Sequence, residues 1–314
     1  MSTADLILHH YDFSNYSEKV RLVLGLKNLA WHSVTIPAWA PKPDYTPLTA
    51  GYRRTPALQI GADVYCDTQL IVAVLEELAP VPTLYPGNDS ARARALTAAL
   101  VHWAEVSLFR PLALYITGRH AARFPAEFHA DRARLHGRPP PSVAQVAASA
   151  AKYQAQVGPQ LAHIEALLGD GAPWLLGDAP GLADLALYEA PWFLETIGGA
   201  DALPAGLPRL RAWMERVAAL GHGRAQTMTA AQALAVARAN QPGAPAAACV
   251  GRAPEGVSCG DAVTVRPLDE DAPASGRLVA VDASRITLAS TSAATGDVHV
   301  HFPRLGYRLG RARA

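Results

Sequence analysis

The sequence is poor in features that mark several protein classes. It has three cysteines, and Cys66, Cys249 and Cys259 form no Cys-x-x-Cys pair. It also has neither a signal-peptide pattern nor a long apolar run, which is typical of a soluble, cytoplasmic protein in a reducing compartment. In such a compartment free thiols are the rule, and a Cys249–Cys259 disulfide is the less favoured alternative.

An excess of charge of either sign is lacking as well. The formal net charge is +1, so the chain has no overall attraction for nucleic acid, and we expect neither a nucleic-acid nor a membrane partner. Hydrophobic residues make up 50% of the 314 residues, which is enough to form the cores of two or three domains.

The most specific local pattern is a hairpin followed by a helix. Alternating side chains at 57–60 and 63–66, on either side of Gly61, predict the hairpin. Apolar residues then recur at helical spacing, so a helix begins near Thr68 and ends before Pro80. Thr68 is the predicted N-cap of this helix.

The residues around this hairpin suit a peptide ligand. A helix N-terminus with a hydroxyl group can bind a carboxylate, and Asp67 beside Thr68 can hold an ammonium group, so the pair fits the zwitterionic end of a γ-glutamyl group. A cis Thr55–Pro56 bond would leave the backbone N–H and C=O of Thr55 free to pair with a cysteinyl unit. The alternative is that Asp67 and Thr68 only cap the helix and that Pro56 is an ordinary trans residue.

Together with the chain length, four segments carry a family resemblance: residues 8–21, Pro56, the Asp67-Thr68 pair and residues 177–184. With them, residues 5 to about 235 resemble a bacterial soluble glutathione S-transferase. The family usually has Glu-Ser or Asp-Ser at the pair, so Asp67-Thr68 is a conservative variant.

The resemblance implies an α/β thioredoxin-like glutathione-binding domain over residues 1–86 and an all-α substrate-binding domain over residues 90–238. It also implies glutathione as the co-substrate and a homodimer as the assembly. In residues 177–184, Gly181 replaces the hydroxyl residue that usually caps a helix, and Asp184 is expected to be structural.

The thiol of glutathione would lie at the loop between the first strand and the first helix. Serine-type members of the family place a hydroxyl there that favours thiolate, and a helix N-terminus lowers a thiol pKa from about 8.5. Ser14 is the best match for this role, and Tyr11, Asn15 and Tyr16 are its alternatives. Asn15 with Glu18 could form a capping box that shifts the helix start by one residue, and Ser14 could merely cap the helix.

The same loop contains no cysteine. Thiol–disulfide exchange needs an attacking sulfur, so a glutaredoxin-type reaction is not expected. Lys42, one of only four lysines, lies in the Pro-rich loop 37–47. Related enzymes use a basic or amide residue there to meet the glycyl carboxylate, which makes Lys42 a candidate and Arg54 its competitor.

From residue 90 onward the sequence predicts long helices, one of which begins at Ser142. In the family, the second substrate, a small hydrophobic electrophile, lies between the two domains. A helix with Trp103, Phe109 and Tyr115 would line that site, and Trp103 and Tyr115 are the best candidates for contact. Aromatic residues at helical spacing that belong to an ordinary core are the alternative.

The resemblance ends at about residue 239. A Gly/Pro/Ala-rich linker, 239–260, precedes alternating segments that predict a small all-β module of four to five strands over residues 261–314. These segments are 263–265, 278–281, 285–288 and 298–302. A module this small buries little surface alone, so we expect it to pack on the rest of the chain or on a second subunit.

Two further features of the module bear on ligands. His299 and His301 share one face of a strand, but no cysteine or carboxylate at a suitable spacing completes a metal site, so we expect none. The end of the chain is basic and is expected to be a solvated tail, with contact to RNA, an acidic partner or glutathione as the alternative. It contains Arg304, Tyr307, Arg308, Arg311 and Arg313.

Two classes of function remain open. In the first, glutathione thiolate formed at Ser14 adds to an electrophile, and conjugation, dehalogenation and isomerisation are all compatible with one site. In the second, the fold serves as a non-catalytic binding or regulatory protein with the β-module as its interaction surface. The Asp67-Thr68 pair and the loop hydroxyl favour the enzyme.

Overall fold

The computed structural model describes residues 5–87, 90–244, 253 and 256–312. Asn88 and Asp89, at the predicted joint between the first two domains, lie outside these ranges. So do Cys249, one half of the possible disulfide, and Arg313 of the predicted tail.

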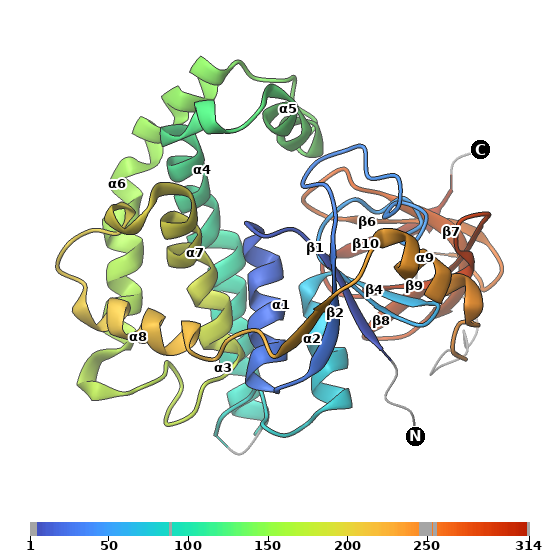
Figure 1. Cartoon of the computed structure of the whole chain (residues 1–314), viewed down its shortest axis with the longest axis horizontal. Coiled ribbons are helices and arrows are strands. Elements are labelled where there is room, and N and C mark those ends of the chain that lie inside the picture. Colours follow the sequence, from blue (N-terminus) through green and yellow to red (C-terminus); the bar gives the residue numbers. More distant parts are fainter. Residues whose placement is uncertain (1–4, 88–89, 245–252, 254–255, 313–314) are drawn as a thin grey trace.

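A single mixed β-sheet runs through the molecule, with the helical domain on one side of its thioredoxin-like part (Figure 1). The strand order is β10-β6-β7-β8-β9-β4-β3-β1-β2-β5. The strands are β1 (Leu6–His10), β2 (Ala30–Thr35), β3 (Ala57–Ile60), β4 (Asp63–Cys66), β5 (Arg224–Thr227), β6 (Ala262–Pro267), β7 (Ala274–Val281), β8 (Arg285–Ser292), β9 (Gly296–Pro303) and β10 (Tyr307–Arg311).

The longer helices fall in the first three quarters of the chain. They are α1 (Asn15–Leu26), α2 (Thr68–Leu78), α3 (Ala91–His102), α4 (Phe109–Arg119), α5 (Ala126–Leu135), α6 (Val143–Leu167), α7 (Leu182–Gly198), α8 (Pro208–Ala218) and α9 (Ala230–Ala239). A π-helical segment, Trp103–Leu108, joins α3 to α4.

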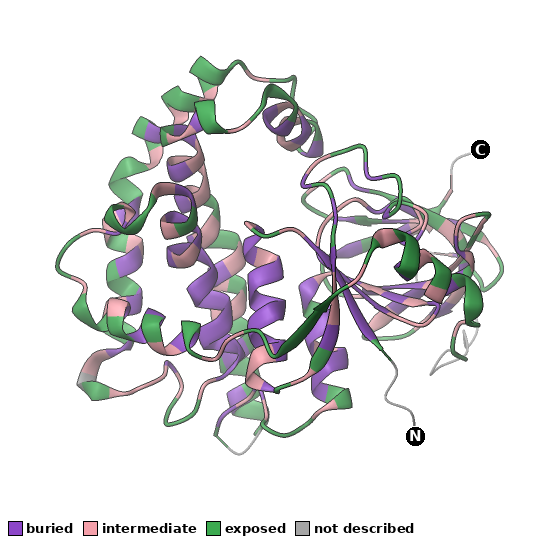
Figure 2. Ribbon diagram, viewed as in Figure 1, coloured by how far each residue is buried: buried purple, intermediate pink, exposed green. Residues whose placement is uncertain are grey.

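The thioredoxin-like part agrees with the sequence pattern. β3 and β4 form the predicted hairpin with Ala57 opposite Cys66, and β1 pairs in parallel with β2 and antiparallel with β3. Side chains alternate along β1, so Leu6 and Leu8 join the core under α1 and α2, whereas Ile7 joins a second core on the opposite face. Burial is concentrated along these strands and on α1, α2 and α7 (Figure 2).

The helical domain is attached through α7, which packs on α1. Asp184 in the first turn of α7 accepts hydrogen bonds from the Gly181 N–H at 3.0 Å and the Trp213 indole N–H at 2.9 Å. This carboxylate therefore has the structural role that the sequence predicts. Ser142 caps α6 with a capping box, also as predicted.

The C-terminal module continues the sheet of the thioredoxin-like part. β9 pairs in parallel with β4, with Asp63 opposite His299, and β5 pairs in parallel with β2 at the other edge. Both edges of the β4-β3-β1-β2 sheet are thus covered, which leaves neither as an open template for another chain. The module packs on the rest of the chain, as its small size requires.

The predicted solvated tail is wrong for residues Tyr307–Arg311. They form β10, which pairs antiparallel with β6. Apolar and polar side chains alternate there, so Tyr307 and Leu309 point inward and are buried.

Across the residues that the structure describes, no helix is both long and apolar enough to span a lipid bilayer.

Candidate functional site

Ser14 lies where the sequence places it, at the N-terminus of α1. Its Oγ accepts a hydrogen bond from the Ser17 N–H at 3.2 Å, so Ser14 is the N-cap and α1 begins at Asn15. The alternative start with Asn15 and Glu18 as a capping box is therefore wrong. Ser14 is buried at the end of the helix where the backbone N–H groups provide partial positive charge.

Asn15 points away from this loop into a buried charge cluster. Its Nδ2 donates to Glu189 Oε2 at 2.7 Å, and Lys19 Nζ lies 2.9 Å from Glu189 Oε1 and also pairs with Glu105. Burial raises the pKa of Glu189 to about 7 in spite of the ammonium beside it. The Asn15 side chain is thus bonded to α7.

The two tyrosines of the loop have different surroundings. The Tyr11 hydroxyl accepts a hydrogen bond from the Arg132 guanidinium at 3.1 Å, so it is held by α5. The Tyr16 ring packs 5.7 Å from that of Phe109 on α4. Burial and the carboxylates of Glu105 and Glu189 raise the pKa of Tyr16 well above its ordinary value, which keeps its phenol protonated.

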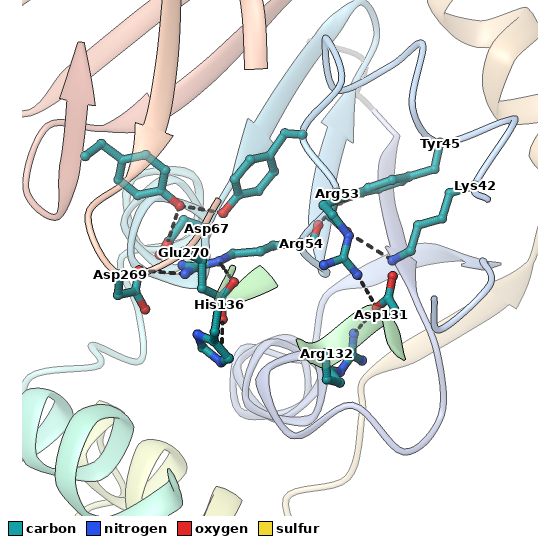
Figure 3. Close-up of polar contacts among 12 residues, drawn as sticks. Lys42, Tyr45, Arg53, Arg54, Asp67, Asp131, Arg132, His136, Asp269 and Glu270 are labelled. Atoms are coloured by element: carbon teal, nitrogen blue, oxygen red, sulfur yellow. Dashed lines mark hydrogen bonds and ion pairs between the residues drawn. The ribbon is translucent and has the colours of Figure 1, made fainter. Parts of the chain in front are cut away.

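Lys42 is brought to the start of the hairpin, next to Thr55. The Thr55–Pro56 bond is cis, and Lys42 Nζ donates to Thr55 Oγ1 at 2.8 Å. Lys42 Nζ also donates to the Arg53 carbonyl at 3.1 Å (Figure 3). These acceptors are neutral. Burial, with the positive charges of Arg53 and Arg132, lowers the pKa of Lys42 to about 7.

Asp131 on α5, which the sequence analysis did not identify, is the acidic partner of the basic residues around Lys42. Asp131 pairs with Arg53 and lies 2.8 Å from Arg132, and its Oδ1 accepts a hydrogen bond from the Ala40 N–H at 3.3 Å. Asp131 is almost fully buried. It ties the loop that carries Lys42 to the helical domain.

At the other end of the hairpin, Asp67 rather than Thr68 is the N-cap of α2. Its Oδ1 accepts a hydrogen bond from the Gln69 N–H at 2.9 Å, and Thr68 is the first residue of the helix. The predicted N-cap Thr68 is therefore wrong by one residue, because a carboxylate caps a helix as well as a hydroxyl does. The second oxygen of Asp67 accepts a hydrogen bond from the Tyr307 hydroxyl at 2.8 Å.

Arg54 pairs with the C-terminal module. Its Nε lies 2.7 Å from Glu270 Oε2 and its Nη2 lies 2.6 Å from Asp269 Oδ1 (Figure 3). Burial alone would lower the pKa of Arg54, but the Tyr52 phenol and Glu270 outweigh burial and hold the pKa above its ordinary range. Of the two candidates for the glycyl carboxylate, Lys42 is the one whose hydrogen bonds go to neutral atoms.

The two aromatic candidates for the second substrate lie on consecutive helical segments of the second domain. Trp103 lines a cavity of about 460 Å³ together with residues of α3 and α6, and no residue of the Ser14 loop lines it. Its ring lies 6.1 Å from that of His163. Tyr115 on α4 is half-buried, with the Arg119 guanidinium 5.9 Å above its ring.

The two histidines of β9 do find a carboxylate. His301 Nε2 lies 2.8 Å from Asp63 Oδ1, whereas His299 Nδ1 is 4.0 Å from the same oxygen. Within the described ranges, however, no three His, Cys, Asp or Glu side chains are arranged to hold a metal ion. The pair instead joins β9 to β4.

Comparison with protein families gives two matches. Residues 8–88 match the N-terminal domain of glutathione S-transferase, and residues 124–216 match its C-terminal domain. A comparison with curated proteins found no match.

Solved structures give a broader match. A GST-like protein from Pseudomonas syringae is 32% identical, with a TM-score of 0.78, and the alignment covers 99% of this chain and 100% of that one, so it includes the C-terminal module. A glutathione S-transferase from Rhodospirillum rubrum F11 is 22% identical over 68% of this chain and 87% of its own, with a TM-score of 0.53. A Tau class enzyme from mango is 19% identical over 68% of this chain and 89% of its own, with a TM-score of 0.52. The last two share the fold of the first two domains.

The family matches, together with the whole-length relative and the paired thioredoxin-like and helical domains, lead to one conclusion: the chain belongs to the glutathione S-transferase family.

Proposed function

We propose that this protein is a glutathione-dependent transferase that adds glutathione thiolate to a small hydrophobic electrophile. The observation that carries the proposal is the buried Ser14 hydroxyl at the N-terminus of α1. A sulfur placed there would meet both a hydroxyl donor and the positive end of the helix, and both favour thiolate over thiol.

The surrounding residues fit the other parts of glutathione. The cis Thr55–Pro56 bond starts the strand that would pair with the cysteinyl unit. Lys42, whose ammonium is bonded to neutral oxygens, suits the glycyl carboxylate. The first turn of α2 at Thr68, together with the Arg54 guanidinium, suits the glutamyl carboxylate.

In the reaction, the thiolate sulfur forms a bond to an electrophilic carbon. The leaving group departs with its electron pair in a substitution, or the carbon skeleton takes up a proton in an addition. Isomerisation would use the same thiolate, with the sulfur leaving again after the bond geometry has changed. The homodimer expected from the family and the cytoplasmic location expected from the cysteine content belong to the same proposal.

Calorimetric titration with glutathione, followed by a conjugation assay with a chloronitrobenzene, tests the proposal. We expect binding at millimolar glutathione or below and a measurable conjugation rate. Absence of binding at millimolar glutathione would contradict the proposed transferase function.

A second candidate is a binding or regulatory protein with this fold. It is favoured by the contacts of the module with the predicted glutathione site, where Arg54 and Asp67 already have partners from residues 269–307. Glutathione binding without turnover of any electrophile tested would support this candidate over the transferase.

A further inference from the structure

The loop between β6 and β7, residues 268–273, crosses from the module to the predicted glutathione site. The Leu268 N–H donates to the Gly306 carbonyl at 3.0 Å, and the Asp271 N–H donates to the Leu135 carbonyl at the end of α5 at 2.8 Å. The loop is therefore fixed to its own module on one side and to the helical domain on the other. Asp269 and Glu270 lie between these anchors.

Arg54 is the point at which the loop meets the thioredoxin-like domain. Both Asp269 and Glu270 pair with its guanidinium, but the Asp269 side chain is 70% exposed and that of Glu270 only 16%. An exposed ion pair contributes little, whereas a partly buried one is less screened by water. Glu270 is thus the carboxylate that mainly holds Arg54.

The same module also supplies a partner for Asp67. The Tyr307 hydroxyl donates to Asp67 Oδ2 at 2.8 Å and lies 2.5 Å from the Tyr52 hydroxyl. The cation and the anion at this end of the site are therefore both matched by the module, with a carboxylate for Arg54 and a hydrogen-bond donor for Asp67 (Figure 3). A carboxylate and a donor are also the two groups that the α-carbon of a glutamyl unit carries.

This arrangement adjoins the rest of the predicted glutathione site. Arg54 directly precedes Thr55 in the chain, and the Thr55 hydroxyl accepts a hydrogen bond from Lys42 at 2.8 Å. The other end of the site differs, because Lys42 there is bonded to neutral oxygens.

We propose that Glu270 and Tyr307 occupy the glutamyl end of the site as internal substitutes for the carboxylate and ammonium groups of the ligand. A γ-glutamyl thiol then binds by exchange: its α-carboxylate replaces Glu270 at Arg54, and its ammonium replaces the Tyr307 hydroxyl at Asp67. This inference rests on the proposed function, and it makes the module a determinant of which thiols bind.

Exchange has a measurable consequence. The affinity of a ligand that must displace an internal partner is reduced to the fraction of molecules in which that partner is released, so the ligand binds more weakly the smaller this fraction is. Weakening the contact between Glu270 and Arg54 should therefore improve the affinity for a ligand that brings its own carboxylate. It should leave unchanged the affinity for a ligand that lacks one.

The experiment compares two thiols with three proteins. The thiols are glutathione and 4-aminobutyryl-cysteinylglycine, which is glutathione without the α-carboxylate. The proteins are the full-length wild type, Glu270→Gln, and Asp297→Asn as the matched control, since Asp297 is an exposed acidic residue of the module that contacts Thr291.

In Glu270→Gln we expect the dissociation constant of glutathione to fall about three- to tenfold, which is the scale of one partly screened ion pair. The dissociation constant of 4-aminobutyryl-cysteinylglycine should stay within about twofold, and Asp297→Asn should behave as the wild type. Tyr307→Phe, which removes only the hydroxyl, should also improve glutathione binding.

Equal or weaker glutathione binding in Glu270→Gln, with the analogue still bound as in the wild type, would overturn the inference and leave the proposed function intact. A lack of glutathione binding in all three proteins would contradict the proposed function and the inference together.

Hydrogen exchange of the Asp271 amide gives an independent reading of the loop. In the wild type this exchange should become faster when glutathione binds. An unchanged hydrogen-exchange rate of the Asp271 amide in the bound protein would overturn the proposal that the ligand displaces Glu270 and Tyr307.

Discussion

Three of the four lysines are buried, although the chain uses arginine for nearly all its other basic positions. Lys19 faces two glutamates, and Lys27 Nζ donates to Glu76 and to the Ala79 and Pro82 carbonyls. Lys42 differs, because its bonds go to neutral atoms and its pKa falls to about 7. Lysine loses its proton on burial more readily than arginine does, which is consistent with the lowered pKa of Lys42. Because no carboxylate among the described residues bonds Lys42, its ammonium is suited to a ligand that brings a negative charge.

The depressed pKa of Lys42 predicts a pH-dependent affinity. The folded pKa lies below the ordinary value of 10.5, so burying Lys42 costs stability below about pH 10.5, and the full cost is reached below about pH 7. A bound carboxylate favours the charged form, so above about pH 7 binding must be accompanied by proton uptake, and affinity should fall by up to tenfold per pH unit.

S-methylglutathione is the probe for this prediction, because its sulfur does not titrate. Its dissociation constant, measured by calorimetry, should rise between about pH 7 and pH 8 and change little between about pH 6 and pH 7. Lys42→Met, which lacks the titrating group, should bind more weakly with a flat profile. A flat profile in the wild type would contradict the role of Lys42.

Replacement of Ser14 tests its contact with the thiolate. Ser14→Ala removes both the predicted hydrogen bond to sulfur and the helix cap, so we expect the conjugation rate near pH 7 to fall about tenfold for each unit by which the thiol pKa rises. The rate and the ultraviolet absorbance of bound thiolate measure this effect.

Ser90→Ala separates the two roles of Ser14. Ser90 caps α3 with the same geometry, its Oγ accepting a hydrogen bond from the Ala93 N–H at 3.2 Å. Both variants should lose about 1 kcal/mol of stability, but Ser90→Ala should keep the full rate. Equal conjugation rates in Ser14→Ala and Ser90→Ala would show that Ser14 only caps its helix and does not contact the thiolate.

At the scale of elements, local patterns predicted local structure. The alternation at 57–66 and the helical spacing after it place β3, β4 and α2 within a residue or two. Contacts between distant residues were not predictable in this way. Asn15 and Glu189 are far apart in the sequence, and no spacing rule connects them.

Lys19 is the centre of the contact between α1 and α7, and its loss should destabilise the protein. Lys19→Met leaves Glu189 buried without its cation, which typically costs about 3–5 kcal/mol. The pKa of Glu189 is already raised to about 7, so the carboxylate becomes neutral as pH falls and the loss should be smaller at about pH 5 than at about pH 8.

Denaturant unfolding at both pH values measures this prediction. Lys152→Met, at an exposed position of α6, is the control and should unfold as the wild type does. An unfolding free energy of Lys19→Met within about 1 kcal/mol of the wild type at the higher pH would show that the ion pair does not support the contact.

At the scale of the whole molecule, the decisive feature is the continuous sheet. The sequence predicted a β-module, but its attachment depends on the pairing of β9 with β4 and on contacts such as Tyr52 with Tyr307, which join opposite ends of the chain. The alternation in Tyr307–Arg311 was present, but the basic residues between its apolar positions suggested a solvated tail. The occupation of Arg54 and Asp67 by the module followed from no local pattern.

A shared core predicts shared unfolding. Phe302 on β9 is fully buried, with its ring 5.2 Å from that of Tyr52 in the thioredoxin-like domain. Phe302→Ala should therefore lower the unfolding free energy by about 3–5 kcal/mol, with one transition for the module and the thioredoxin-like domain. Calorimetry measures this loss, and Leu305→Ala, at a residue that is 75% exposed, is the neutral control. Separate melting of the module would contradict the shared core.

The most direct test of the account is a crystal structure of the protein with bound glutathione. The account predicts the glutathione sulfur at hydrogen-bond distance from Ser14 Oγ, the cysteinyl backbone paired with Thr55, and the Glu270 carboxylate displaced from Arg54. Glutathione bound with its sulfur away from Ser14, while Glu270 remains on Arg54, would contradict it.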